Sequence, residues 1–181
     1  MKDLPRDVQI SRRREEYRGA VWAIIKEELE FGGEVITRDY LQHMGAVAVV
    51  AINDTGEVMT VTQYRHAVGM ELVEIPAGLL DEENESPLAA AQRELLEETG
   101  YTASDWQTLV DVCTTPGSSS EAIRIFLARD LQEHHWDSAE LPAEESEMTR
   151  QWVPIADAVA HILAGDWTSP TAVAGILALV A

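Results

Sequence analysis

The sequence is short of basic residues and of cysteine. It contains 13 Lys and Arg against 32 Asp and Glu, which gives a formal net charge of −19 in 181 residues. This balance argues against nucleic acid or an anionic membrane surface as a partner, because both would be repelled. The lone Cys113 rules out a disulfide within the chain and suits a reducing compartment. We therefore expect a cytoplasmic protein that binds neither nucleic acid nor membrane.

Long apolar runs are also missing. The longest candidate covers residues 171–181, about half of the ~20 residues that a membrane-spanning helix needs. It follows Ser169 and Pro170, which favour the start of a helix, so we interpret it as a terminal core helix. With 46% hydrophobic residues, a chain of this length can bury one substantial core. We predict one domain over residues 1–181.

The order of apolar segments and turn residues predicts a mixed α/β domain. Strands are expected at 21–29 and 33–41, followed by a continuous apolar strand, buried on both faces, at 45–52. The remaining predicted elements are strands at 58–64, 106–113, 122–128 and 151–154 and helices at 155–164 and 170–180.

Residues 86–100 carry the signals of a short helix with defined ends. Ser86 is a good N-cap, Pro87 suits the first helical position, and Gly100 can take the left-handed conformation that closes a helix. Its apolar residues recur at helical spacing, so one face is expected to be buried. The residues of that face are Leu88, Ala91 and Leu95.

Acidic residues gather at the C-terminal end of this helix. Glu94 and Glu98 are one turn apart, and Glu97 lies beside them. Like charges at this spacing cost roughly 0.2–0.5 kcal/mol, and they also oppose the helix dipole. A solvated acidic face, in which Arg93 pairs with Glu97, is one interpretation. We favour the other, a site for a hard divalent cation such as Mg²⁺, because carboxylate oxygens are its preferred protein ligands.

Residues 78–101 resemble the Nudix box, G-x5-E-x7-R-E-U-x-E-E-x-G-U with U a bulky apolar residue. This is the motif of hydrolases that cleave nucleoside diphosphates linked to another moiety X. Its second half matches the run RELLEETGY that begins at Arg93, and Glu85 stands seven intervening residues before Arg93. Gly78 precedes Glu85 by six intervening residues instead of five. We interpret the extra residue as a lengthened turn in the polar stretch 81–84, where an insertion costs little.

The resemblance implies the Nudix fold, a mixed β-sheet sandwiched between α-helices, here with an N-terminal antiparallel strand region. It implies Mg²⁺ or Mn²⁺ as the cofactor. The metal ligands that it implies are Glu94, Glu97, Glu98 and the backbone carbonyl of Ala77. It also places Arg93 and Glu97 among the catalytic residues.

Features outside the box resemble the ADP-ribose pyrophosphatase subfamily. The approach to the box contains QYRH at 63–66 and EIPAG at 74–78, and a proline, Pro116, stands in the glycine- and serine-rich loop that follows the box. The resemblance implies that Arg65 contacts phosphate or ribose, although a surface salt bridge would also account for this arginine. Pro116 and Glu121, in the same loop, are further candidates for substrate binding.

The acidic stretch 140–149 resembles the loop that carries the family's catalytic glutamate. Its position ahead of Trp152 selects Glu145 as the general base that activates water, with Glu144 and Glu147 as alternatives. A loop whose acidic residues only keep it solvated is the other interpretation.

The subfamily's enzymes are typically dimers in which N-terminal strands pack against the partner, and an aromatic residue and an arginine flank the adenine. Trp22 and Arg38 lie in the matching strands, although a tryptophan in an early strand is as often a core residue. We therefore expect a homodimer with residues 1–44 as the dimerisation region and residues 45–181 as the Nudix core.

Together these features predict metal-dependent hydrolysis of the pyrophosphate bond of ADP-ribose to AMP and ribose 5-phosphate. One alternative is the same chemistry on another nucleoside diphosphate sugar. A second alternative is a regulatory module that binds ADP-ribose without cleaving it. The complete acidic set Glu94, Glu97 and Glu98 argues against this second alternative, because a binder does not need it.

Overall fold

The computed structural model describes residues 1–134 and 147–181. Its internal contacts divide the chain into two compact units. The first unit comprises Met1–Gly45 and Cys113–Glu121, and the second comprises Ala46–Val112 and Ala122–Ala181. The division after Gly45 falls beside the predicted boundary between residues 44 and 45.

The first unit is built on three antiparallel strands, β1 (Ile10–Arg18), β2 (Ala23–Phe31) and β3 (Glu34–Gln42), in the order β1-β2-β3. β2 and β3 confirm the two strands expected in this region, each shifted by one or two residues. β1 was not predicted, because its sequence ISRRREEYR lacks apolar alternation and all of its residues are exposed. A strand of this kind is stabilised by its neighbour and not by burial of its own side chains.

Polar side chains connect the three strands of this sheet. Arg13 of β1 donates to Oε1 of Glu27 on β2 at 2.7 Å and to the hydroxyl of Tyr40 on β3 at 3.2 Å. Glu27 is buried, and Tyr40 also donates to it at 3.2 Å. Burial of the Tyr40 hydroxyl, together with the negative charge of Glu27, raises its pKa. The sheet is therefore held together by cross-strand pairs as well as by its backbone ladder.

The second unit contains two sheets. Their strands are β4 (Ala46–Ala51), β5 (Glu57–Arg65), β6 (Met70–Glu74), β7 (Ala77–Leu79), β8 (Tyr101–Cys113), β9 (Ala122–Glu133) and β10 (Thr149–Pro154). The four-stranded sheet has the order β7-β4-β9-β8, with β4 antiparallel to β7 and parallel to β9. The three-stranded sheet has the antiparallel order β10-β5-β6. The short strands β6 and β7, on either side of the EIPAG segment, were not predicted.

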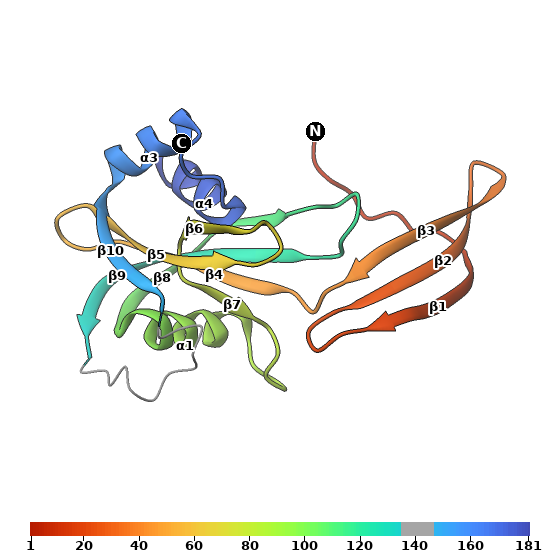
Figure 1. Ribbon diagram of the computed structural model, residues 1–181, viewed down its shortest axis with the longest axis horizontal. Coiled ribbons are helices and arrows are strands. Elements are labelled where there is room, and N and C mark those ends of the chain that lie inside the picture. The colour runs from red at the N-terminus through yellow and green to blue at the C-terminus, as the bar shows by residue number, and fades with distance from the viewer. Residues whose placement is uncertain (135–146) are drawn as a thin grey trace. The chain divides into compact units, whose positions relative to one another are not determined.

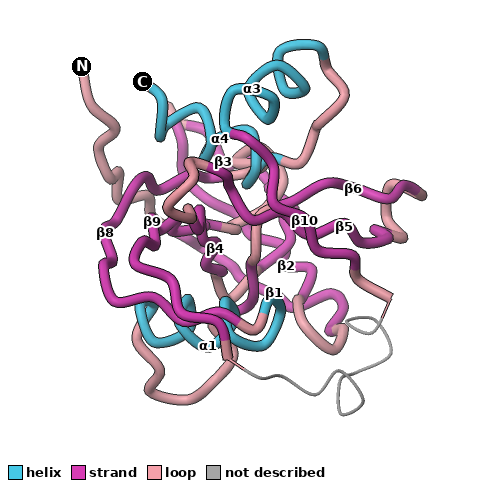
Figure 2. The backbone as a smooth tube through the Cα atoms, turned by 90° about the vertical axis from the view of Figure 1, so that its left-hand side faces the viewer, coloured by secondary structure: helices cyan, strands magenta, loops and turns pink. Residues whose placement is uncertain are grey.

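Three helices lie in the described part of the second unit: α1 (Pro87–Thr99), α3 (Ile155–Ala164) and α4 (Pro170–Val180). α3 and α4 cover one side of the strands and α1 covers the other (Figures 1 and 2). β4 is buried on both faces as predicted, because its alternate residues enter two different cores. Val50 packs in the core under α3 and α4, whereas Val49 packs in the core under α1. The mixed α/β sandwich is therefore confirmed.

α4 is the terminal core helix expected from the sequence. It approaches the sheets closely at Gly175, where an added Cβ would lie 2.8 Å from Val50 and 3.1 Å from Ile75. In the parts of the chain that the structure describes, no helix combines the length and the apolar character needed to cross a membrane.

Candidate active site

The helix α1 begins and ends at the residues predicted from the sequence. The Ser86 side chain accepts a hydrogen bond from the backbone N–H of Ala89 at 3.2 Å, and Pro87 occupies the first turn. Gly100 closes the helix at φ 76°, with its N–H bonded to the Leu96 carbonyl at 2.9 Å. These caps fix where the acidic end of the helix lies in the unit.

Of the three residues expected on the buried face of α1, two are buried and the third is exposed. Ala91 and Leu95 are fully buried, together with Ala90, but the Leu88 side chain is 38% exposed. Leu88 lies in the first turn, close to the polar loop before the helix, and the core does not extend that far. The buried stripe is thus shifted toward the C-terminal half, where the carboxylates are.

Arg93 forms ion pairs with acidic side chains near the middle of α1. Its guanidinium binds both carboxylate oxygens of Glu85, at 3.0 and 3.2 Å, and donates to Glu94 at 2.7 Å and to Glu97 at 3.0 Å. These partners raise the pKa of Arg93 further above its already high value, so the guanidinium stays charged. Arg93 therefore fixes three carboxylates relative to the helix.

The extra residue between Gly78 and Glu85 is absorbed by the loop, as expected for a lengthened turn. Asn84 takes a left-handed conformation, with φ 65°, immediately before Glu85. The Glu85 side chain still reaches Arg93 with both oxygens and is only 15% exposed. The insertion therefore leaves the ion pair of the motif intact.

Two carboxylates of α1 lie against β7. Glu98 is buried and accepts a hydrogen bond from the Ala77 N–H at 2.9 Å. Glu94 lies against the backbone of Gly78, where an added Cβ would collide with the carboxylate. Burial raises the pKa of Glu94, and the adjacent Arg93 opposes this shift only in part. Sequence reasoning placed Gly78 in the motif but did not identify this contact, which becomes visible only when the strand and the helix are paired in space.

These side chains bear on the predicted metal site. Among the residues that the structure describes, no three His, Cys, Asp or Glu side chains are grouped so that they could hold a metal ion. Arg93 holds Glu97, whose side chain is 47% exposed, whereas Glu98 turns toward Ala77. The expected convergence of three carboxylates is thus not seen in this arrangement, and the ligand assignment stays a prediction.

The donor set nevertheless fits a hard divalent cation. Glu94 and Glu98 are one turn apart on the face of α1 that meets β7, and β7 contributes the backbone of Ala77 and Gly78. The two carboxylates offer oxygen ligands, the type that Mg²⁺ and Mn²⁺ take in proteins, whereas the printed contact of Ala77 is made by its N–H. Burial keeps the pKa of Glu94 raised even though Arg93 lies 2.7 Å from it. A cation bound to this carboxylate would favour its ionised form.

A first prediction follows from the contact between Gly78 and Glu94. We expect Gly78→Ala to lower any turnover that depends on Glu94 on the order of 10²-fold, because displacement of a reacting group by about 1 Å has effects of that size. The melting temperature should change little, because the end of the flexible Glu94 side chain can move away from the added methyl group. Steady-state kinetics and thermal melts on the same preparation measure both effects. If Gly78→Ala still lowers turnover when it is added to Glu94→Gln, then Gly78 does not act through Glu94.

Arg65 is held by Glu74, a residue that the sequence analysis did not assign to the site. Its Nε and Nη2 donate to the two carboxylate oxygens of Glu74 at 3.0 and 2.6 Å, and Gln63 donates to the same carboxylate at 3.3 Å. Glu74 is buried, whereas the Arg65 side chain is 45% exposed. The salt bridge considered as the alternative therefore exists, between a half-exposed arginine and a buried glutamate. The acidic first residue of the EIPAG segment was the available signal.

Trp22 and Arg38 lie in the first unit. Trp22 is 39% exposed and borders a cavity of about 200 Å³ that is also lined by His43. Arg38 is exposed and donates to the backbone carbonyl of Thr37 at 2.8 Å. In the β2–β3 register, Arg38 of β3 pairs with Glu27 of β2. Glu27 is five residues from Trp22, which corresponds to roughly 17 Å of extended chain. One chain therefore does not place these two side chains on opposite sides of one base.

Pro116 and Glu121 also belong to the first unit. Pro116 is exposed in a turn closed by the hydrogen bond from the Ser118 N–H to the Thr115 carbonyl at 2.9 Å. Glu121 accepts a hydrogen bond from the Thr114 hydroxyl and lies 3.5 Å from Nε2 of His43. Their roles in substrate binding stay predictions.

Glu145, the predicted general base, and its alternative Glu144 lie outside the described residues. Glu147, the second alternative, is described and exposed, and it borders a cavity on the β10-β5-β6 sheet. Mutagenesis of these three glutamates can therefore identify the general base.

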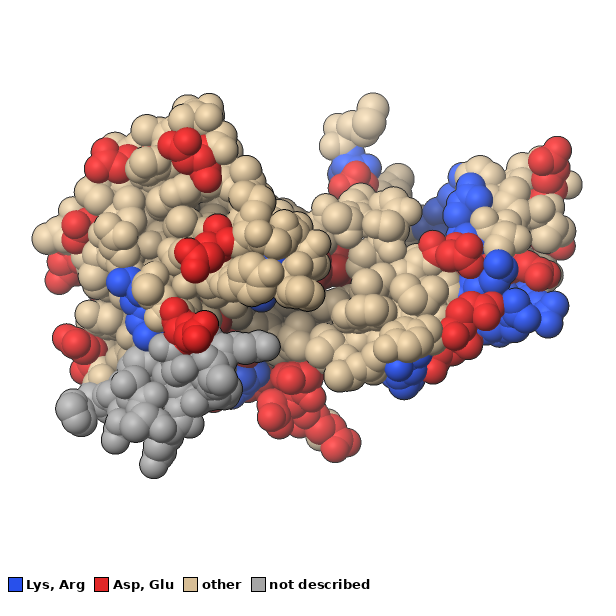
Figure 3. Space-filling view, in the orientation of Figure 1, with Lys and Arg blue, Asp and Glu red and all other residues tan. Residues whose placement is uncertain are grey.

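Charge is distributed unevenly between the two units. Eight of the 13 basic residues belong to the first unit, and Figure 3 shows basic side chains over strands β1, β2 and β3, mixed with acidic ones. The second unit has five arginines and no lysine in its sequence. Four of them pair with carboxylates, and Arg150 donates to the backbone carbonyl of Glu98. An anionic ligand of this unit therefore depends on added cations to offset its repulsion.

Comparisons with known proteins agree with this geometry. The NUDIX domain profile matches residues 42–173. The ADP-ribose pyrophosphatase of Mycobacterium tuberculosis is 45% identical over 168 residues, which cover 89% of this chain and 77% of that protein. The ADP-ribose pyrophosphatase of Bacillus subtilis is 40% identical over 116 residues, which cover 64% of this chain and 62% of that protein.

A solved structure shares the fold. The crystal structure of an ADP compounds hydrolase aligns with a TM-score of 0.78 at 22% sequence identity, covering 99% of this chain and 95% of that one. At 22% identity this similarity supports the fold alone. Membership of the family follows from the NUDIX domain profile and from the relatives at higher identity.

Proposed function

We propose that this chain, which belongs to the NUDIX domain family, hydrolyses the pyrophosphate bond of ADP-ribose to AMP and ribose 5-phosphate. The observation that carries the proposal is the packing of the Glu94 and Glu98 carboxylates against Gly78 and the Ala77 N–H, which holds both carboxylates where α1 meets β7. The names of the relatives that match most of this chain support ADP-ribose as the substrate.

The proposed cofactor is Mg²⁺ or Mn²⁺, held by Glu94, Glu97, Glu98 and the carbonyl of Ala77. When bound, such an ion supplies positive charge to phosphate oxygens and acidifies a coordinated water. Arg93 positions Glu94 and Glu97 through ion pairs of 2.7 and 3.0 Å. Because these two carboxylates share one guanidinium, Arg93 also has to release Glu97, or share it, when Glu97 acts as a ligand.

The proton of the attacking water needs an acceptor. We assign this role to Glu145, which removes the proton as the water attacks phosphorus. Arg65 is the proposed contact to a phosphate or ribose oxygen, and Glu74 holds its guanidinium in a fixed orientation through two hydrogen bonds. The Arg65 contact would then use a side chain that is oriented before the substrate arrives.

We further propose that the enzyme is a cytoplasmic homodimer that binds adenine with residues of two copies. Trp22 lies just before β2 and Arg38 on β3 pairs with Glu27, five residues further along, so roughly 17 Å separates their positions. This separation supports a site in which side chains from different copies flank one base. Pro116 and Glu121 are the remaining proposed substrate contacts.

The adenine role of Trp22 gives a second prediction. We expect Trp22→Ala to weaken ADP-ribose binding by about 5- to 100-fold, as loss of a stacked aromatic costs roughly 1–3 kcal/mol per base. Ribose 5-phosphate, which has no base, should bind as before. The measurement is a titration of both ligands with wild type and variant. Equal losses for both ligands would contradict adenine stacking, and a fully active monomer in sedimentation would contradict the two-copy site.

The main alternative is the same hydrolysis with another nucleoside diphosphate sugar. A substrate panel at fixed Mg²⁺ separates the alternatives, because the proposed assignment predicts the highest kcat/KM for ADP-ribose. A chain that binds ADP-ribose without turnover would instead be a regulatory module.

A further inference from the structure

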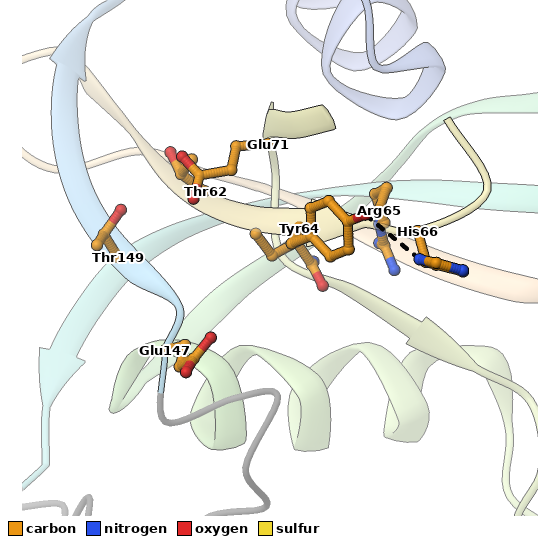
Figure 4. A pocket seen from close by; sticks show the side chains of 8 residues that line it. Thr62, Tyr64, Arg65, His66, Glu71, Glu147 and Thr149 are labelled. Carbon is orange, nitrogen blue, oxygen red and sulfur yellow. Dashed lines mark hydrogen bonds between the residues drawn. The ribbon is translucent and has the colours of Figure 1, made fainter. Parts of the chain in front are cut away.

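A cavity of about 370 Å³ opens on the β10-β5-β6 sheet of the second unit. Its size falls in the range of small-molecule sites, about 300–1,000 Å³. Figure 4 shows side chains from all three strands around it, together with Glu147 from the segment before β10. The function proposed above leaves most of these residues without a role.

The strand register explains why these side chains meet. Thr149 of β10 pairs with Thr62 of β5, and Tyr64 of β5 pairs with Glu71 of β6. Thr62 and Tyr64 are two residues apart, so they and their partners point to one face of the sheet. Two hydroxyls, one carboxylate and one aromatic ring are thus presented together by regular strands. Such a platform is fixed by backbone hydrogen bonds and not by a loop.

The charged side chains around the cavity determine which chemical groups of a ligand can bind there. Its arginine, Arg65, pairs with the buried Glu74 at 2.6 Å, while Glu71 and Glu147 contribute two more carboxylates. Both would repel a phosphate in the cavity, so of the two contacts proposed for Arg65 the cavity favours the one to a ribose oxygen. Sugar hydroxyls, in contrast, donate to carboxylates and exchange hydrogen bonds with threonine hydroxyls, and a sugar ring can pack on an aromatic face. The lining therefore suits an uncharged polyhydroxyl group.

A short path along the chain links the cavity to the acidic end of α1. Arg65 of its lining binds Glu74, and Glu74 precedes Ala77, whose N–H donates to Glu98, by three residues. A substrate whose pyrophosphate lies at α1 can therefore extend its second moiety toward this sheet.

We propose that this cavity is the subsite for the uncharged sugar ring of the substrate's second moiety, with Glu71 and Thr62 as its specificity-determining residues. The inference rests on the proposed function, for which the ring is the distal ribose of ADP-ribose. Glu71 accepts hydrogen bonds from ring hydroxyls, Thr62 exchanges one, and Tyr64 supports the ring. Selection among nucleoside diphosphate sugars then takes place on β5 and β6, outside the Nudix box.

The test measures the binding of ribose 5-phosphate, inorganic phosphate and AMP to the full chain by calorimetry. The ratio of the dissociation constants of phosphate and ribose 5-phosphate isolates the contribution of the ring. We expect Glu71→Ala to reduce this ratio about tenfold or more, and Thr62→Val to reduce it about threefold or more, as hydrogen bonds to charged and neutral groups predict. AMP affinity should not fall in either variant.

The direction of the change separates hydrogen bonding from general electrostatics. Removing a negative charge from a chain of net charge −19 should by itself tighten the binding of an anion such as ribose 5-phosphate. The control Asp157→Asn, an exposed residue of α3 away from the cavity, reports that effect alone. The proposal requires Glu71→Ala to weaken ribose 5-phosphate binding while Asp157→Asn does not.

An unchanged ratio in Glu71→Ala and in Thr62→Val, with unaltered melting temperatures, would overturn the subsite. Parallel loss of AMP and ribose 5-phosphate would overturn it as well, because that result indicates damage to a shared phosphate site. Since these titrations need no turnover, they are independent of the proposed reaction. Failure to hydrolyse ADP-ribose contradicts the proposed function, and an unchanged ratio in a chain that does hydrolyse it contradicts the subsite alone.

Discussion

Glu98→Gln and Glu94→Gln are each expected to lower divalent-dependent hydrolysis of ADP-ribose by on the order of 10³-fold, while the protein stays folded. A metal ion contributes several kcal/mol of charge stabilisation to such a reaction, and each 1.36 kcal/mol corresponds to a tenfold change in rate. Both substitutions keep side-chain volume and remove only a charged oxygen. The measurement is kcat and KM over a Mg²⁺ titration, with Glu83→Gln as the control.

Glu83 suits that control because it is an exposed acidic residue of the loop before α1, so its substitution removes the same charge near the site. We expect Glu83→Gln to retain the turnover of the parent within about twofold, as is usual for a surface change. Near-parental turnover of both Glu94→Gln and Glu98→Gln at saturating Mg²⁺ would remove these residues from the metal site.

The same Glu94 variant tests the electrostatic strain of the metal-free site. Burial raises the pKa of Glu94 in the folded state, so its stabilising contribution is present below the unfolded-state pKa and is lost as pH rises through the folded-state pKa. At neutral pH the ionised carboxylate is thus unfavourable when no cation is bound. We expect Glu94→Gln in EDTA to melt at or above the temperature of the parent. A clearly lower melting temperature would show that the Arg93–Glu94 pair outweighs the burial of the charge.

Glu145→Gln is expected to lower kcat by about 10²- to 10⁴-fold, the usual contribution of a general base, with little change in substrate affinity. Metal binding should survive, because the proposed ligands lie on α1 and β7. The deciding comparison is Glu144→Gln, Glu145→Gln and Glu147→Gln under saturating Mg²⁺ and ADP-ribose. A plot of kcat against pH should also lose its acidic limb in the variant that lacks the base.

If Glu145→Gln keeps kcat within about threefold of the parent, a margin far below the usual contribution of a base, the role passes to the neighbour whose substitution abolishes turnover. If none of the three variants loses activity, the base is a glutamate of the Nudix box. A rise in KM without loss of kcat would instead indicate substrate binding by this segment.

The helix α1 shows how far local sequence signals reach. Its ends were predictable because Ser86, Pro87 and Gly100 each meet a requirement of the backbone at that position. β1 was missed for the opposite reason: its residues are all exposed, and only pairing with β2 makes them a strand. Leu88 was expected in the core because periodicity gives the direction of a side chain and not the extent of the core that receives it.

The contacts of the candidate site could not be predicted from the sequence, and its residues stay predictions. The spacing of the motif proposed Glu94 and Glu98 because they are one helical turn apart, and Arg93 with Glu97 for the same reason. It did not show that Gly78 leaves space for Glu94 or that Glu74 holds Arg65, because these pairs join segments whose distance in space depends on the sheets. The cavity at Thr62 and Glu71 was invisible for the same reason, as its lining follows from the register of three strands.

The most direct test of the proposed function is a single assay of ADP-ribose turnover, with and without Mg²⁺, in which the products are identified by chromatography. The account predicts AMP and ribose 5-phosphate in equal amounts when Mg²⁺ is present and no turnover in EDTA. Mn²⁺ added to the EDTA-treated protein in excess of the chelator should restore activity. Turnover in EDTA at an undiminished rate, or binding of ADP-ribose without formation of AMP in the presence of Mg²⁺, would contradict it.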